Sequence, residues 1–104
     1  MLRPFWVDLH MHTALSPCGE LEMGAPDIIG RAKEVGLDVI GIADHNTCEN
    51  FPGVSAAAKI AGGTPFVLPC IETQSAEDIH ILCVFPDYET AYKYKEWLWL
   101  KIRP

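Results

Sequence analysis

Apolar residues along this chain gather in short runs, and several of the segments between these runs show apolar residues at helical spacing. The short runs predict four β-strands, at residues 5–9, 37–43, 66–72 and 79–85. The helical spacing predicts three helices, at residues 26–35, at residues 54–61 and from residue 87 onward. The resulting order, β-α-β-α-β-β-α, is typical of an α/β fold with a largely parallel sheet.

Individual residues mark the ends of these elements. Pro26 suits the first turn of the first helix, and Gly36 supplies its stop. Asp87 is the expected cap of the last helix. The fourth strand is apolar on both sides of the chain, so we expect it to be buried on two faces.

The end of the chain is strongly apolar. Its large apolar residues are Trp97, Leu98, Trp99, Leu100 and Ile102. A lone domain rarely finishes by exposing such a patch. We therefore expect residues 1–104 to form a single domain that is truncated at its C-terminus, or one whose last helix packs against a partner subunit in a homo-oligomer.

The composition is that of one globular domain of 104 residues, with 49% hydrophobic and 21% charged residues. The net charge of −6 argues against a long nucleic acid as partner, although bound divalent cations would still allow a small phosphorylated substrate. The chain opens with no charged-then-apolar leader and has no apolar stretch of transmembrane length, so we expect a cytoplasmic protein with no membrane partner. Four cysteines without CxxC spacing predict reduced thiols rather than disulfides.

Three of the four histidines lie at the ends of predicted strands. His10 and His12 are two residues apart, so on an extended strand their side chains share one face. His45 follows the second strand and can join them only if the two strands are neighbours. Imidazole is the commonest protein ligand for zinc and related metals, and ligands gather at the carboxyl ends of parallel strands. The pattern therefore predicts a metal centre.

Carboxylates and a further histidine extend this candidate centre. Glu72, on the third strand, can bridge two cations, as multi-metal hydrolytic sites require. His80, on the fourth strand, is either another ligand or a hydrogen-bonded core histidine. Asp8 and Asp44 each precede a histidine, where they either orient an imidazole ring or bind metal themselves.

Four segments, taken in order, resemble the motifs of one family, the PHP (polymerase and histidinol phosphatase) domains. The segments are residues 7–13 (VDLHMHT), 41–47 (GIADHNT), 69–73 (PCIET) and 77–82 (EDIHIL). The loop at residues 15–20 (LSPCGE) is also similar to the Ser-Pro-Cys loop of one branch of small bacterial and archaeal members. The resemblance covers about residues 5–86.

The resemblance implies a distorted (β/α) barrel with mostly parallel strands, flanking helices and up to three divalent metal ions, commonly zinc, manganese or iron. By matching positions, His10, His12 and Glu72 would hold one ion. Glu72 would be shared with a second ion that His80 contacts, and His45 would serve the remaining one. Cys18 stands where some relatives carry a ligand. It is either a ligand or an inert loop cysteine, and Glu20 is the competing candidate for that position.

The activity implied is that of a metal-dependent phosphoesterase, in which metal-activated water hydrolyses a phosphomonoester or a nucleotide-type phosphoester. Asp44 and His45 are the candidate catalytic residues. The chain departs from the family after His80, because no later histidine follows to supply the remaining ligands. We therefore expect a partial barrel with fewer ions and with weak or absent turnover on its own. The alternatives are a non-catalytic metal-binding or regulatory module, and an oligomer that completes its site between chains.

Overall fold

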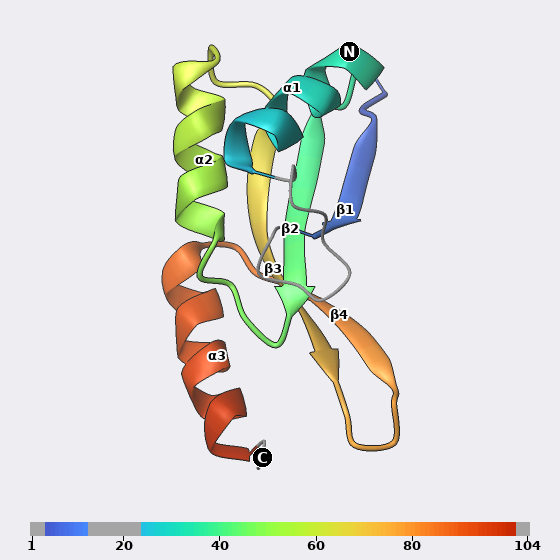
Figure 1. Ribbon diagram of the computed structural model, residues 1–104, viewed down its shortest axis with the longest axis vertical. Helices are drawn as coiled ribbons and strands as arrows, with labels where there is room; N and C mark the ends of the chain where they lie inside the picture. The colour runs from blue at the N-terminus through green and yellow to red at the C-terminus, as the bar shows by residue number, and fades with distance from the viewer. Residues whose placement is uncertain (1–3, 13–23, 102–104) are drawn as a thin grey trace.

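The computed structural model describes residues 4–12 and 24–101. Its strands are β1 (Val7–Met11), β2 (Val39–His45), β3 (Phe66–Gln74) and β4 (His80–Val84). Its helices are α1 (Ala25–Val35), α2 (Phe51–Ile60) and α3 (Tyr88–Lys101). The order of the elements is the one predicted from the apolar pattern, and the α/β class is confirmed (Figure 1).

The strands form one sheet in the order β1-β2-β3-β4. β1, β2 and β3 run parallel, and β4 returns antiparallel to β3. The sheet is therefore largely parallel, as predicted. The carboxyl ends of its three parallel strands meet at one edge of the sheet, where ligands collect in α/β proteins.

All three helices cover the same face of the sheet (Figure 1). Ile40 pairs with Val67 across β2 and β3, so both side chains point to one face, and both belong to the core formed with α1 and α2. Ile71 lies on this face as well, because it is four residues after Val67 on β3, and it packs in a second core cluster with Ala91 and Leu98 of α3. The opposite face carries His45 and Glu72 at its carboxyl edge.

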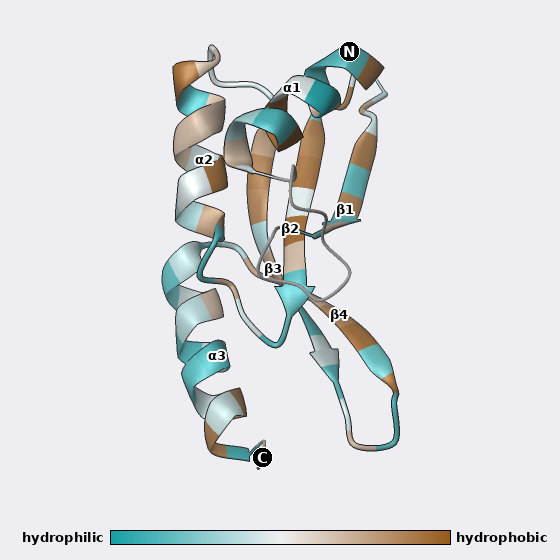
Figure 2. Cartoon of the chain, viewed as in Figure 1, coloured by the Kyte–Doolittle hydropathy of each residue, from teal (hydrophilic) through white to brown (hydrophobic). Residues whose placement is uncertain are grey.

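The helices lie on the sheet so that apolar residues of both are buried between them. β2 and β3 are largely hydrophobic, and hydrophilic residues begin at the carboxyl end of β2 (Figure 2). The first core cluster consists of Ile28, Ile29, Ala32, Ile40, Ile42, Val54, Ala58 and Val67.

No helix in the described ranges has both the length and the apolar character needed to cross a membrane.

The predicted burial of the fourth strand is wrong. Ile81 is 57% exposed and Val84 is 45% exposed, because β4 pairs with β3 on one side and lies at the edge of the described sheet on the other. An antiparallel edge strand can be as apolar as a central one, so its composition did not reveal its place.

Element boundaries also differ from the prediction. α2 begins at Phe51 rather than residue 54, because Pro52 occupies its first turn, where a missing backbone N–H costs nothing. β1 extends through Met11 instead of stopping at residue 9, so it includes His10. The cap of the last helix is confirmed, since the Thr90 N–H donates to Asp87 Oδ1 at 2.8 Å.

α3 buries a lysine that the sequence pattern did not predict. Lys95 is 1% exposed, and its Nζ lies 4.0 Å from the centre of the Tyr92 ring and 4.2 Å from the centre of the Trp99 ring. The same Nζ donates to Glu49 Oε1 at 2.7 Å. This ammonium group therefore joins α3 to the loop that follows β2.

Gly41 allows β1 and β2 to approach each other closely. A Cβ atom at this position would lie 2.7 Å from the Leu9 carbonyl oxygen and 2.8 Å from Cys70 Sγ. Backbone atoms cannot move aside as the end of a side chain can, so any larger residue must displace β1. β1 carries His10, and this contact therefore sets where that histidine lies.

We predict that Gly41→Ala lowers the free energy of unfolding by about 1–3 kcal/mol, because the added methyl group overpacks the contact between β1 and β2. Urea denaturation measures this change. Gly30→Ala on α1 is the matched control: nothing lies within 4 Å of its added Cβ, so it should raise stability by about 0.5–1 kcal/mol. Equal midpoints for the two variants would contradict the close approach.

Candidate metal centre

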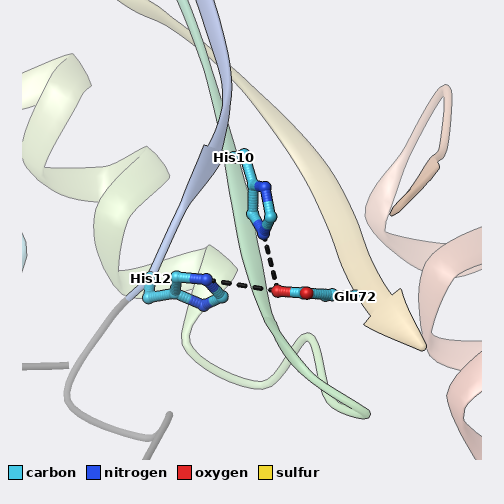
Figure 3. Close-up of side chains that lie close together, drawn as sticks. All are labelled: His10, His12 and Glu72. Carbon is cyan, nitrogen blue, oxygen red and sulfur yellow. Dashed lines mark hydrogen bonds and ion pairs between the residues drawn. The ribbon is translucent and has the colours of Figure 1, made fainter. Parts of the chain in front are cut away.

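The strands bring four histidines and one glutamate to the same edge of the sheet. His10 lies in β1, His12 follows that strand, and His80 is the first residue of β4. His45 ends β2 and is the register partner of Glu72 on β3. Figure 3 shows His10 and His12 pointing toward the Glu72 carboxylate.

A bulge in β1 shapes the first part of this cluster. Asp8 pairs with Ile40 and Met11 with Ile42, so two residues of β1 stand opposite the single residue Gly41. The Asp8 carboxylate accepts the N–H of His10 at 3.0 Å. Asp8 therefore supports the backbone of the bulge rather than an imidazole ring.

Glu72 is the centre of the cluster, and both of its carboxylate oxygens are contacted. The distances to Oε1 are 2.6 Å from Nε2 of His10, 3.2 Å from Nε2 of His12 and 3.4 Å from Nε2 of His45. Oε2 lies 2.7 Å from Nδ1 of His80. The Glu72 side chain is only 6% exposed, so these rings form most of its polar surroundings.

The imidazole rings also pack on one another. The rings of His12 and His45 are stacked, with centres 4.8 Å apart and planes 7° apart. His45 meets His80 edge-on at 5.7 Å. Burial lowers the pKa of His12, and the nearby His45 lowers it further, because two positive rings in contact repel each other.

The effect of hydrogen bonds on the pKa of Glu72 is larger than the opposing effect of burial. Burial alone would raise the pKa of this carboxyl, but the hydrogen bonds with His10 and His80 lower it to about 2. The hydrogen bond with Glu72 in turn raises the pKa of His80, and a second one with Asp78 adds to that effect. Glu72 is thus a buried carboxylate that stays ionised at neutral pH.

These residues fit divalent metal ions. They form two groups, His10–His12–Glu72 and His45–Glu72–His80, and the ligand atoms of each group lie within 4.8 Å of one another. Imidazole nitrogen and carboxylate oxygen together suit zinc, manganese and iron. Glu72 belongs to both groups, as a bridging carboxylate would.

Five of the residues singled out from the sequence thus come together: His10, His12, His45, Glu72 and His80. Asp44 is fully buried, and alternation along β2 places it on the helix-covered face, opposite to His45. Among the described residues it belongs to neither ligand group. Cys18 and Glu20 lie outside the described residues.

Sequence reasoning missed the residue that joins the ends of β2 and β3. Asn46 has a φ of 57°, a left-handed conformation that asparagine adopts more readily than most residues. Its N–H donates to the Glu72 carbonyl at 2.9 Å, and its Oδ1 accepts the N–H of Gln74 at 3.0 Å. An asparagine directly after a strand was the available signal.

Sequence reasoning also missed Asp78. Its Oδ1 lies 3.1 Å from His80 Nε2 and accepts the side-chain amide of Gln74 at 2.8 Å. It stands two residues before His80, as Asp8 stands two residues before His10. That repeated spacing was the signal in the sequence.

Comparisons with known proteins agree with this geometry. The model of the PHP domain family matches residues 8–96. A solved structure from Bifidobacterium adolescentis, of a protein classed by inference as a metal-dependent phosphoesterase, is similar with a TM-score of 0.60 and 25% sequence identity. The match covers 77% of this chain and 27% of that chain, so this chain spans about a quarter of that protein's length. The likeness confirms a partial (β/α) barrel with flanking helices. No curated protein matches the chain.

The lowered pKa of Glu72 predicts a specific pH dependence of folding. A carboxyl whose pKa falls from 4.5 to about 2 on folding stabilises the folded state above pH 4.5, and this contribution is lost as the pH falls toward about 2. Chemical denaturation of the metal-free protein and of Glu72→Gln should show the wild type more stable above that window. The difference in the free energy of unfolding between the two proteins should shrink steadily as the pH falls from 4.5 toward about 2. A difference that stays constant with pH would contradict the ionised carboxylate.

Proposed function

Since the chain belongs to the PHP domain family, we propose that its histidines and Glu72 bind divalent metal ions and act in the hydrolysis of a phosphoester. The observation that carries this proposal is the convergence of four imidazole rings on the two oxygens of one buried carboxylate. Packing alone gives no reason to gather so many imidazoles around one negative charge.

His10, His12 and Glu72 would hold one ion, and Glu72 would share a second with His45 and His80. When bound, divalent cations neutralise charge on the phosphoryl oxygens and activate water for attack. Glu72 would keep the two groups in a fixed relation, because its Oε1 contacts histidines of both groups and its Oε2 contacts His80 of the second. The ions could be zinc, manganese or iron, since the donor set suits each of them.

The exposed side of the cluster indicates where a substrate would enter. The side chains of His10 and His80 are 50% and 38% exposed, whereas those of His12 and His45 are 18% and 16% exposed. A phosphate group would therefore approach past His10 and His80. The net charge of −6 favours a small phosphorylated substrate over a long nucleic acid.

Catalytic assignments for individual residues belong to this proposal as well. His45 stacks against His12 at the inner side of the cluster, which suits a residue close to the reacting phosphate. Asp44 lies on the other face of β2, so it would act through the backbone position of His45 rather than by touching substrate. A cytoplasmic location stays a prediction.

We predict that the protein loaded with Mn²⁺ or Zn²⁺ releases phosphate from phosphomonoesters and that His12→Ala and His45→Ala each reduce this rate by at least about 100-fold. Each substitution removes one imidazole from a different ligand group. A colorimetric phosphate assay across several phosphomonoesters measures the rate. Glu34→Gln is the control: its side chain is 74% exposed on α1, and it should leave the rate unchanged.

Two outcomes separate the alternatives. Bound metal without hydrolysis would contradict the hydrolytic proposal and favour a non-catalytic metal-binding module. Hydrolysis that persists in both histidine variants and in the presence of a chelator would contradict the metal centre itself. Native mass measurement in the same preparation shows whether the active species is a monomer or an oligomer.

A further inference from the structure

The turn between β3 and β4 carries a carboxylate that meets the outer side of the His80 ring. Asp78 Oδ1 lies 3.1 Å from His80 Nε2, and the opposite ring nitrogen, Nδ1, lies 2.7 Å from Glu72 Oε2. The ring is therefore held at both nitrogens. Gln74 fixes the Asp78 carboxylate in turn, since its side-chain amide donates to the same Oδ1 at 2.8 Å.

The backbone conformation at Asp78 is one that favours glycine. Its φ is 63°, in the left-handed region where a glycine has no steric cost. The Asp78 N–H donates to the Ser75 carbonyl at 3.0 Å, and the Ser75 N–H donates to the Ile79 carbonyl at 2.9 Å. This is the hairpin form in which glycine is preferred at the left-handed position. An aspartate is sterically less favourable than glycine in this conformation.

The turn does not need the carboxylate to close. Ser75 Oγ already accepts the N–H of Ile79 at 3.1 Å, and the other turn bonds are between backbone groups. The contacts of Oδ1 are with the side chains of His80 and Gln74. The carboxylate therefore faces the metal-ligand candidate rather than its own turn.

We propose that Asp78 is a positioning residue, which holds Nε2 of His80 so that Nδ1 faces Glu72 and the ligand group His45–Glu72–His80. This inference rests on the proposed metal centre. A cation binds the lone pair of Nδ1, so the single N–H of a metal-bound His80 ring lies on Nε2, where the Asp78 carboxylate accepts it. Metal-ligating histidines commonly donate their other N–H to such a carboxylate.

Three substitutions in this turn test the inference. Asp78→Gly removes the carboxylate and relieves the left-handed backbone, so the fold should be as stable as the wild type or more stable. Asp78→Asn keeps a side-chain oxygen that can accept the Nε2–H and tolerates the same backbone conformation. Glu77→Gln removes a neighbouring negative charge from the same turn and serves as the control for charge alone.

Calorimetric titration of each variant with Zn²⁺ or Mn²⁺ gives the readout. We expect Asp78→Gly to weaken binding at the group containing His80 by about 10–100-fold, with binding at His10–His12–Glu72 unchanged. We expect Asp78→Asn to restore affinity to within a few-fold of the wild type and Glu77→Gln to match the wild type. Urea denaturation of the same preparations checks whether each variant is folded.

The outcomes distinguish this inference from the proposed function. Two ions bound by the wild type with equal affinities in Asp78→Gly would overturn the role of Asp78 and leave the metal centre standing. Equal weakening in Asp78→Gly and Glu77→Gln would overturn it too, because the effect would then be one of charge. If the wild type binds no metal, the proposed function fails and the role of Asp78 fails with it.

Discussion

The ionised carboxylate of Glu72 is the constraint on which the rest of this site depends. Its side chain is 6% exposed, and burying a charge costs free energy unless partners replace the lost water. Imidazole rings from three strands and the segment after β1 supply those partners. They also supply nitrogen ligands. The histidines that stabilise the buried Glu72 carboxylate therefore also form, with it, a ligand set that suits divalent cations.

The fold holds this arrangement through its backbone. Parallel pairing places His45 directly beside Glu72, and Gly41 lets β1 come close enough to bring in His10 from the other side. Asn46 then joins the end of β2 to the carbonyl of Glu72. The helices contribute indirectly, since they cover one face of the sheet and leave the other face to the polar cluster. Most of the geometry of the site thus comes from strand register rather than from loops.

The sequence predicted much of this. Apolar runs gave the order of the helices and strands along the chain, because strands that are covered on both faces are continuous in their hydrophobicity. The His-x-His spacing indicated two ligands on one face, and the ends of parallel strands indicated where His45 and Glu72 would meet them. The motifs around these residues also resemble those of the PHP family, and the family match over residues 8–96 confirms that assignment.

The remainder depends on contacts that a local pattern does not contain. The apolar pattern of β4 could not show that it lies at an edge, because edge position is a property of the whole sheet. A lysine in a helix is usually exposed, and Lys95 is buried because Tyr92, Trp99 and Glu49 surround its ammonium group in the folded chain. The bulge in β1 follows from pairing with β2, and the contact of Asp78 with His80 follows from the conformation of the turn between β3 and β4.

Elemental analysis of the metal-loaded protein beside Glu72→Gln tests the central claim most directly. Glu89→Gln, whose side chain is 79% exposed on α3, is the matched control for a lost carboxylate. If Glu72 joins both ligand groups, its replacement should remove all ions held by the described cluster, while the control keeps the content of the wild type. A Glu72→Gln protein that is folded and retains the full metal content would contradict the account.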